Sequence, residues 1–146
     1  MELLREEYGE YAEKVKKAVT MFSDAFREFP FHVKSLYRGP QNGGPANLLY
    51  RKPTGFESTM TCYPYDDIDS WRSIYPKDVY INQFRKLKDG WKLGLEEIKD
   101  MPDCDFKRMA YGGYALFCSS YLQSEFVNAR ESDDKEYLLR LVTEEK

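Results

Sequence analysis

Apolar residues recur at alternating intervals of four and three positions through the first part of the chain. This spacing matches the 3.6-residue period of an α-helix and places every member of the series on one face. Most of the residues between them are Glu, Lys or Arg, which suit a solvent-facing side. Pro30 then ends the pattern, because the residue before a proline is pushed out of the α region. The series predicts a helix over residues 3–29, and its members are Leu4, Tyr8, Tyr11, Val15, Ala18, Phe22, Ala25 and Phe29.

Three more helices are predicted in the second half of the chain. Residues 77–99 follow Pro76 and carry an apolar face, and residues 105–130 follow the turn sequence DMPDC with a wide apolar side. A short charged helix is expected over residues 134–143. The predicted fold class is therefore mainly α, with three long helices of which the last two form an antiparallel hairpin.

Glycines inside the two hairpin helices are a second clue to packing. Each mid-helix glycine costs about 1 kcal/mol relative to alanine, so a compensating contact is expected. In a hairpin that turns near residue 102, Gly90 lies as far from the turn as Gly113, and Gly94 lies as far from it as Ala110. We therefore expect these small residues to face each other and to bring the two helices close together.

The connection between the first and second long helices, residues 30–76, has no helical period. Structureless connections of this length are uncommon in compact domains and are usually functional or disordered. This one is rich in Tyr, Phe, Leu and Trp, which favours an ordered segment. Short extended pieces are predicted at His32–Arg38 and Glu57–Tyr63, separated by Gly/Pro turns.

Length and charge narrow the class of protein. A chain of 146 residues is expected to form a single domain. Its net charge of −3, with Lys and Arg scattered among acids, argues against a nucleic-acid partner. No apolar run reaches the roughly 20 residues that a membrane span needs. The N-terminal sequence MELLREEYGE does not resemble a signal peptide, so a cytoplasmic location is predicted.

Few residues are available for metal or cofactor chemistry. Cys62, Cys104 and Cys118 form no CxxC pair and are expected to be reduced thiols, and His32 is the only histidine. We predict no metal site and no cofactor. Glycoside hydrolysis would need two carboxyl groups placed across a sugar, and the sequence shows no enclosing scaffold for such a pair, so no catalytic residue is predicted.

The polar and aromatic stretch YPYDDIDSWR is the best candidate for a binding site. Carbohydrate recognition uses flat apolar faces together with carboxylate, amide or guanidinium groups for the hydroxyls. The alternative is that an aspartate caps a turn, another pairs with the arginine, and the tryptophan is buried in the core. The candidate ligand-binding residues are Tyr65, Asp66, Asp67, Asp69, Trp71 and Arg72, with Gln41, Asn42 and Asn47 upstream.

Several strings along the chain together resemble a known group of proteins. FREFPFH, GPQNGGPANLLY, PTGF and YPYDDIDSWR, followed by QF, GW and GL in the helix expected at 77–99, are similar to the C-terminal region of large bacterial proteins grouped with glycoside hydrolases. The similarity runs from about Phe22 to Arg130. It implies that the chain is the C-terminal part of a larger protein whose catalytic groups lie in a preceding barrel-type domain.

Two functions remain open at this point. The chain is expected to be a non-catalytic helical module of a carbohydrate-active protein, in which residues 30–76 contribute to a sugar site or pack on a catalytic domain. The alternative is an assembly module without a ligand, in which the same rings bury against another subunit as in a homo-oligomer. An open concave pocket at Trp71 and Arg72 favours the first, and a flat apolar contact favours the second.

Overall fold

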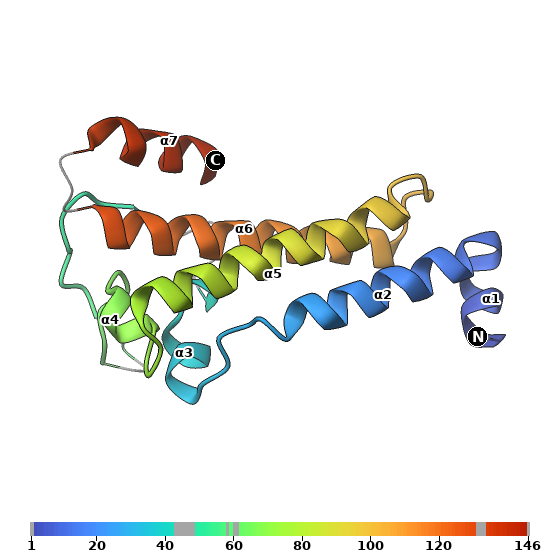
Figure 1. Ribbon diagram of the computed structural model, residues 1–146, viewed down its shortest axis with the longest axis horizontal. Coiled ribbons are helices and arrows are strands. Elements are labelled where there is room, and N and C mark those ends of the chain that lie inside the picture. Colours follow the sequence, from blue (N-terminus) through green and yellow to red (C-terminus); the bar gives the residue numbers. More distant parts are fainter. Residues whose placement is uncertain (1, 43–48, 58, 60–61, 131–133, 146) are drawn as a thin grey trace.

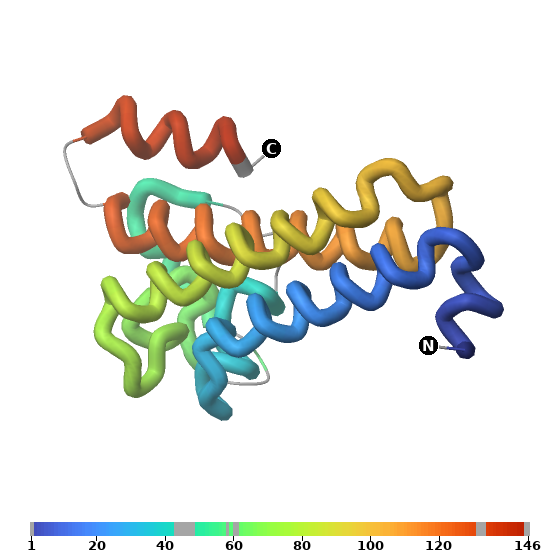
Figure 2. The backbone as a smooth tube through the Cα atoms, turned by 45° about the vertical axis from the view of Figure 1, so that its right-hand side comes forward, coloured from blue at the N-terminus to red at the C-terminus, as the bar shows by residue number. Residues whose placement is uncertain are grey.

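The computed structural model describes residues 2–42, 49–57, 59, 62–130 and 134–145, and this part of the chain is mainly helical, as the sequence predicts. Three long helices, α2 (Ala12–Phe26), α5 (Lys77–Ile98) and α6 (Asp105–Ala129), lie side by side (Figures 1 and 2). α5 packs against both α2 and α6, and α7 (Lys135–Glu145) packs along α6.

α5 and α6 run in opposite directions on either side of a short turn. Near the turn, Lys107 Nζ donates a hydrogen bond to the Lys99 carbonyl at 2.6 Å. Farther from it, Lys88 Nζ lies 5.0 Å from the centroid of the Tyr121 ring. Residues near the turn on α5 therefore lie beside residues near the turn on α6, and residues far from it lie beside residues far from it.

The first helical segment is broken near its start, so the prediction of one helix over 3–29 is wrong there. α1 (Glu2–Tyr8) ends at a 3₁₀ turn, Gly9–Tyr11, and α2 begins at Ala12. Gly9 has a φ of +53°, in the left-handed region that glycine adopts at little cost. The apolar stripe crosses this break, since the Tyr8 ring packs 5.7 Å from that of Phe106. α2 also ends at Phe26 instead of Phe29.

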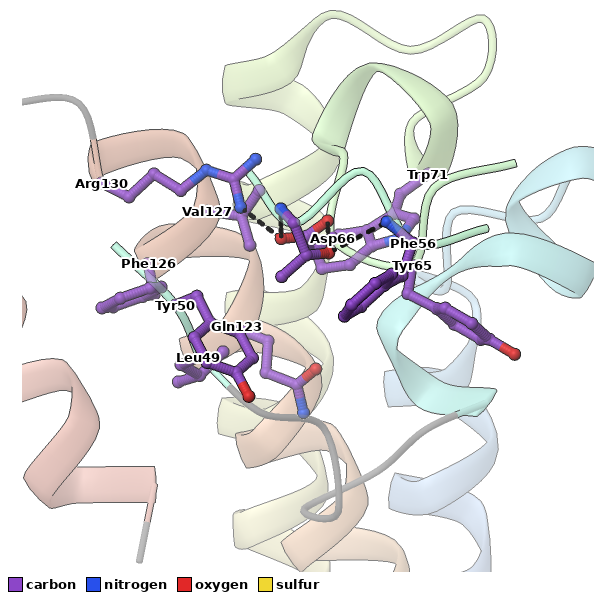
Figure 3. A pocket seen from close by; sticks show the side chains of 11 residues that line it. Leu49, Tyr50, Phe56, Tyr65, Asp66, Trp71, Gln123, Phe126, Val127 and Arg130 are labelled. Atoms are coloured by element: carbon purple, nitrogen blue, oxygen red, sulfur yellow. Dashed lines mark hydrogen bonds and ion pairs between the residues drawn. The ribbon is translucent and has the colours of Figure 1, made fainter. Parts of the chain in front are cut away.

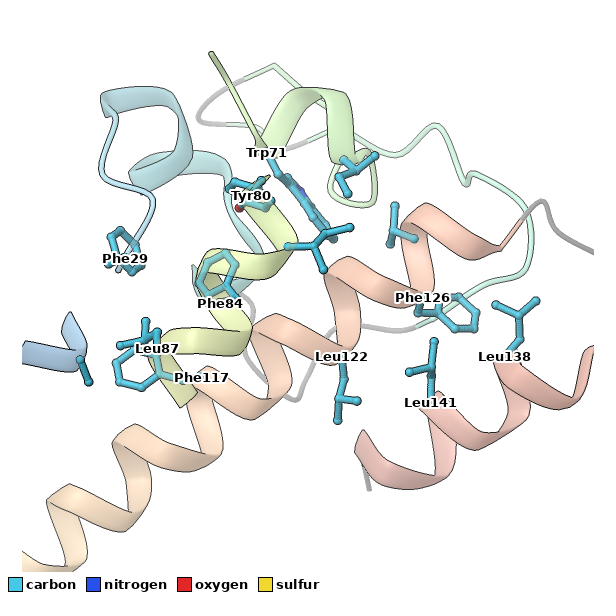
Figure 4. Close-up of a cluster of buried hydrophobic side chains, with 14 residues drawn as sticks. Phe29, Trp71, Tyr80, Phe84, Leu87, Phe117, Leu122, Phe126, Leu138 and Leu141 are labelled. Carbon is cyan, nitrogen blue, oxygen red and sulfur yellow. The ribbon is translucent and has the colours of Figure 1, made fainter. Parts of the chain in front are cut away.

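Two clusters of buried side chains form the core, and the partly buried Trp91 packs against both. The larger cluster joins α5, α6 and α7 to the connection (Figure 4). The smaller cluster lies nearer the turn between α5 and α6. The larger comprises Ala25, Phe29, Ile68, Trp71, Tyr80, Ile81, Phe84, Leu87, Phe117, Leu122, Phe126, Val127, Leu138 and Leu141; the smaller comprises Val15, Ala18, Phe22, Leu95, Ile98, Met101 and Ala110.

α7 is fixed to α6 by apolar and polar contacts together. Leu138 and Leu141 are buried in the larger cluster. The hydroxyls of Tyr121 and Tyr137 donate to the two oxygens of Glu125 at 3.0 and 3.1 Å. Burial, with the nearby Glu125 carboxylate, raises the pKa of Tyr121 to about 12, so this hydroxyl keeps its proton and remains a donor at neutral pH.

The long connection contains helices that the sequence analysis did not predict. α3 (Val33–Arg38) occupies the stretch expected to be extended, so that prediction is wrong. Its start is capped by His32, whose Nδ1 accepts from the Lys34 backbone N–H at 3.2 Å. A 3₁₀ turn (Pro40–Asn42) and the single-turn α4 (Ile68–Trp71) follow.

The second predicted extended piece, Glu57–Tyr63, lies only in part among the described residues. One isolated antiparallel bridge joins Glu57 to Pro64, and the described residues contain no strand. The backbone N–H of Tyr65 donates to the Phe56 carbonyl at 3.1 Å beside this bridge. Phe56 and Tyr65 are therefore held next to each other.

Gly90, Gly94 and Gly113 do make close contacts, but not the predicted ones. A methyl group at Gly94 would overlap the ring of Phe22 on α2, and one at Gly90 would come within 2.9 Å of the Ala25 side chain, also on α2. Gly113 instead faces Trp91 on α5. The number of residues from the turn predicts how far along the helix axis each glycine lies, but not which side of the helix it faces. Gly90 faces α2, so the predicted pairing of Gly90 with Gly113 is wrong.

Two matched glycine substitutions test this packing. Gly94→Ala should lower the free energy of unfolding by about 1–2 kcal/mol, because overpacking against Phe22, which stacks on Trp91 at 4.3 Å, outweighs the gain in helix propensity. Gly112→Ala meets no heavy atom within 4 Å and should raise it by up to about 1 kcal/mol. Urea denaturation measures both values. Stabilisation by both substitutions would contradict the close approach of α5 to α2.

Candidate functional site

A cavity of about 260 Å³ lies between the connection and the C-terminal half of α6 (Figure 3). One wall comes from residues 49–56 and 65–71, and the other comes from the last two turns of α6 and the residue that follows it. The lining combines aromatic rings with one carboxylate, one guanidinium and one amide. It comprises Leu49, Tyr50, Thr54, Phe56, Tyr65, Asp66, Trp71, Gln123, Phe126, Val127 and Arg130.

An ion pair joins the two walls. Arg130 Nη1 lies 2.9 Å from Asp66 Oδ2, and the two side chains are only 6% and 13% exposed. Arg130 follows the last residue of α6, where a positive charge is favoured by the helix dipole. Thr54 donates to the same carboxylate, from its backbone N–H to Oδ2 and from its hydroxyl to Oδ1, both at 3.2 Å. Asp66 is thus neutralised and held by three donors.

The outer part of the cavity carries aromatic rings with free surface. Tyr50, Phe56 and Tyr65 are 48%, 71% and 54% exposed. The backbones of Phe56 and Tyr65 are joined by the hydrogen bond from the Tyr65 N–H to the Phe56 carbonyl, which places both residues at this edge of the cavity. Flat rings of this kind bind the apolar faces of ring-shaped ligands.

Trp71 forms a rigid part of the wall. α4 turns its side chain inward together with that of Ile68, and the indole is 1% exposed. Its Nε1–H has no hydrogen-bond acceptor among the described residues. Gln123, also fully buried, donates from its amide nitrogen to Ser119 Oγ at 2.7 Å.

Three of the sequence-predicted residues, Tyr65, Asp66 and Trp71, are brought together in the cavity. Asp67 is not among the lining residues. Its carboxylate caps α4, accepting from the Asp69 N–H at 3.0 Å and from the Ser70 N–H at 3.2 Å. This is the capping role that the sequence analysis gave as its alternative.

Asp69 and Arg72 also lie outside the cavity lining. Arg72 Nε donates to Asp69 Oδ1 at 2.7 Å, and Lys77 Nζ lies 3.1 Å from Asp69 Oδ2. The hydrogen bond from Arg72 lowers the pKa of Asp69 below its ordinary value. Arg72 also donates to the Tyr75 carbonyl at 2.8 Å. These charges therefore fix the entry into α5.

The amides upstream serve the backbone of α3. Gln41 donates to the carbonyls of Ser35 and Leu36 at 2.8 and 3.1 Å, and Asn42 donates to that of Leu36 at 2.8 Å. Both amides satisfy the Leu36 carbonyl at the end of this short helix, and Gln41 shares the Ser35 carbonyl with the Gly39 N–H. Asn47 lies outside the described residues.

The α6 side of the cavity was not predicted from the sequence. Gln123, Phe126, Val127 and Arg130 were assigned only to a helix with a wide apolar side. One signal was present: the sequence SSYLQS places four small or amide side chains, Ser119, Ser120, Gln123 and Ser124, on positions that are all buried. Buried polar side chains on a helix indicate a specific internal contact rather than a simple apolar face.

The described residues contain no group of three or more His, Cys, Asp or Glu side chains that could hold a metal ion. Within the same residues, no helix is both long and apolar enough to cross a membrane. No family model, no curated protein and no solved structure matches this chain.

Breaking the ion pair should destabilise the fold strongly. Asp66→Asn leaves the Arg130 charge buried without compensation, and we expect it to lower the free energy of unfolding by about 3 kcal/mol. Asp69→Asn is the matched control, since Asp69 is 52% exposed in its ion pairs and should cost no more than about 1 kcal/mol. Chemical denaturation measures both, and equal losses would contradict the structural role of the Asp66–Arg130 pair.

Proposed function

We propose that this chain is a non-catalytic helical module that binds a small carbohydrate in the cavity between its connection and α6. The observation that carries the proposal is the combination of exposed ring faces with a neutralised ion pair in one concave site. A sugar presents apolar C–H faces and uncharged hydroxyls, and both types of surface have a counterpart in this lining.

The size of the cavity favours a single sugar ring. About 260 Å³ is slightly below the range of roughly 300–1,000 Å³ that small-molecule pockets usually occupy. A longer oligosaccharide would extend over the exposed rings of Tyr50, Phe56 and Tyr65 at the edge of the cavity. The inner part of the cavity would then hold one sugar unit of the oligosaccharide.

A catalytic role for the cavity is disfavoured by its carboxyl groups. Glycoside hydrolysis uses two of them, about 5–5.5 Å or 6.5–9.5 Å apart. Asp66 is the one acid among the residues that line this cavity, and it is already paired with Arg130. The resemblance of the sequence to the C-terminal region of glycoside hydrolase-like proteins supports a module of this kind beside a separate catalytic domain.

Tryptophan fluorescence tests the proposal, because only one of the two tryptophans lines the cavity. In a Trp91→Phe variant, the remaining signal comes from Trp71. We expect glucose, galactose, mannose or N-acetylglucosamine to change this signal with saturation in the millimolar range, about −4 kcal/mol.

The reciprocal Trp71→Phe variant is the control and should give no response from Trp91. Absence of any saturable Trp71 response to these sugars and to their disaccharides, with both variants folded by circular dichroism, would contradict carbohydrate binding.

A second candidate function, protein assembly, is favoured by an exposed apolar patch at the α3 end of the molecule. Phe31, Val33 and Ile74 are 69%, 65% and 72% exposed. They are neighbours because Ser73 Oγ lies 2.7 Å from His32 Nδ1 and the Tyr75 hydroxyl donates to the Phe31 carbonyl at 3.2 Å. Such a patch could bury against a catalytic domain or a second copy of the chain.

Molar mass in solution distinguishes self-assembly from the other options. If the patch joins two copies, light scattering should show a dimer, and Ile74→Asp should raise its dissociation constant at least about tenfold by placing a charge in the contact. Leu93→Asp is the control, because Leu93 is 61% exposed on α5 and outside the patch. A monomeric unmodified chain at high concentration would exclude self-assembly through this surface.

A further inference from the structure

The two tryptophans differ in what their indole N–H groups contact. Trp91 Nε1 donates to the Ala110 carbonyl at 2.9 Å. Trp71 Nε1 has no acceptor among the described residues, although the side chain is 1% exposed. Buried indole N–H groups usually find a partner, since leaving one without an acceptor forfeits its hydration. Trp71 lines the cavity, so a ligand atom placed against the edge of its indole would supply the missing acceptor.

Asp66 has acceptor capacity left in the same cavity. A carboxylate offers about four lone-pair positions. Arg130 Nη1, the Thr54 N–H and the Thr54 hydroxyl occupy three of them. With these donors from the described residues in place, one position remains for a donor on a ligand.

The charge balance of the site decides which ligands fit. Asp66 and Arg130 compensate each other, so the lining carries no net charge for a ligand to neutralise. A carboxylate or an ammonium group entering this partly enclosed space would lose hydration without gaining a counter-charge. Neutral ligands avoid that cost.

From these three observations we infer that the cavity selects a neutral, ring-shaped compound through one hydroxyl group. The hydroxyl oxygen accepts from Trp71 Nε1, and its proton is donated to Asp66. A hydroxyl supplies both an acceptor and a donor, which an ether, a carboxylate or an ammonium group does not. The inference rests on the proposed ligand site and names the chemistry of its inner end.

A series of probes that share one ring tests the inference on the unmodified chain. The probes are cyclohexanol, methoxycyclohexane, cyclohexanecarboxylate and cyclohexylammonium, which differ only in the group on the ring. Titrations are followed by the two indole N–H signals in ¹⁵N–¹H spectra, assigned with the Trp91→Phe variant. Cyclohexanol should bind about tenfold more tightly than each of the other three, the difference expected for one additional satisfied hydrogen bond.

The indole signals also report the contact itself. Cyclohexanol should move the Trp71 signal downfield, as expected for a new acceptor, and leave the Trp91 signal in place. The inference is overturned if any of the other three probes binds as tightly as cyclohexanol, or if the Trp71 signal does not move.

Trp71→Phe removes the donor and keeps a ring, and should weaken binding of cyclohexanol and of methoxycyclohexane, whose oxygens both accept, at least about fivefold, while cyclohexylammonium, which has no acceptor, is weakened less. Equal weakening of cyclohexanol and cyclohexylammonium would contradict a role for Nε1. If this variant does not fold, the four probes on the unmodified chain still decide the question.

The outcomes separate this inference from the proposed function. Cyclohexanol binding with the predicted selectivity, but no binding of any sugar, would uphold the hydroxyl site and reject carbohydrate as its ligand. Sugar binding that perturbs the cavity while the Trp71 indole signal stays unmoved would uphold the carbohydrate module and reject the hydroxyl contact.

Discussion

The ion pair between Asp66 and Arg130 joins parts of the chain that are 64 residues apart. It holds the long connection against the end of α6, and both walls of the cavity depend on it. Buried pairs of this kind often add little net stability, because two charges lose hydration when the pair forms. Their effect lies in geometry: a partner that is missing or displaced leaves a buried charge, so the pair strongly disfavours any other placement of the connection. Thr54 strengthens this restriction by binding the same carboxylate from a third position.

The fold could be predicted where the hydrophobic period was long and clear. Residues 77–99 and 105–130 were expected as helices, and the structure has them at Lys77–Ile98 and Asp105–Ala129. The break at Gly9 was missed because the apolar spacing continues across it unchanged. α3 was missed for a different reason: six residues are too few to show a period, and its cap is a histidine, which is not one of the usual capping side chains.

The site could be predicted only on the side where its residues are close in sequence. Tyr65, Asp66 and Trp71 lie within one short polar and aromatic stretch, whereas Arg130 and Gln123 contribute from a helix that looked apolar. Within the stretch, the residues differ in where their partners lie. Asp67 and Asp69 find theirs within a few residues, and so take up capping and local ion pairs. Asp66 finds its partners 12 and 64 residues away, a distance that no local pattern reveals.

Trp71 belongs both to the core and to the cavity wall, so the two interpretations of the aromatic stretch are compatible. Its inner face packs in the larger cluster, which fixes the indole before any ligand arrives. A fixed group loses little freedom on binding and can therefore contribute selectivity at low entropic cost. Tyr50, Phe56 and Tyr65 are about half exposed or more, and ordering them on a ligand opposes binding. A rigid inner end and an open outer edge together favour weak but selective binding. A second surface that covered the outer rings would raise the affinity, as the proposed neighbouring domain would do.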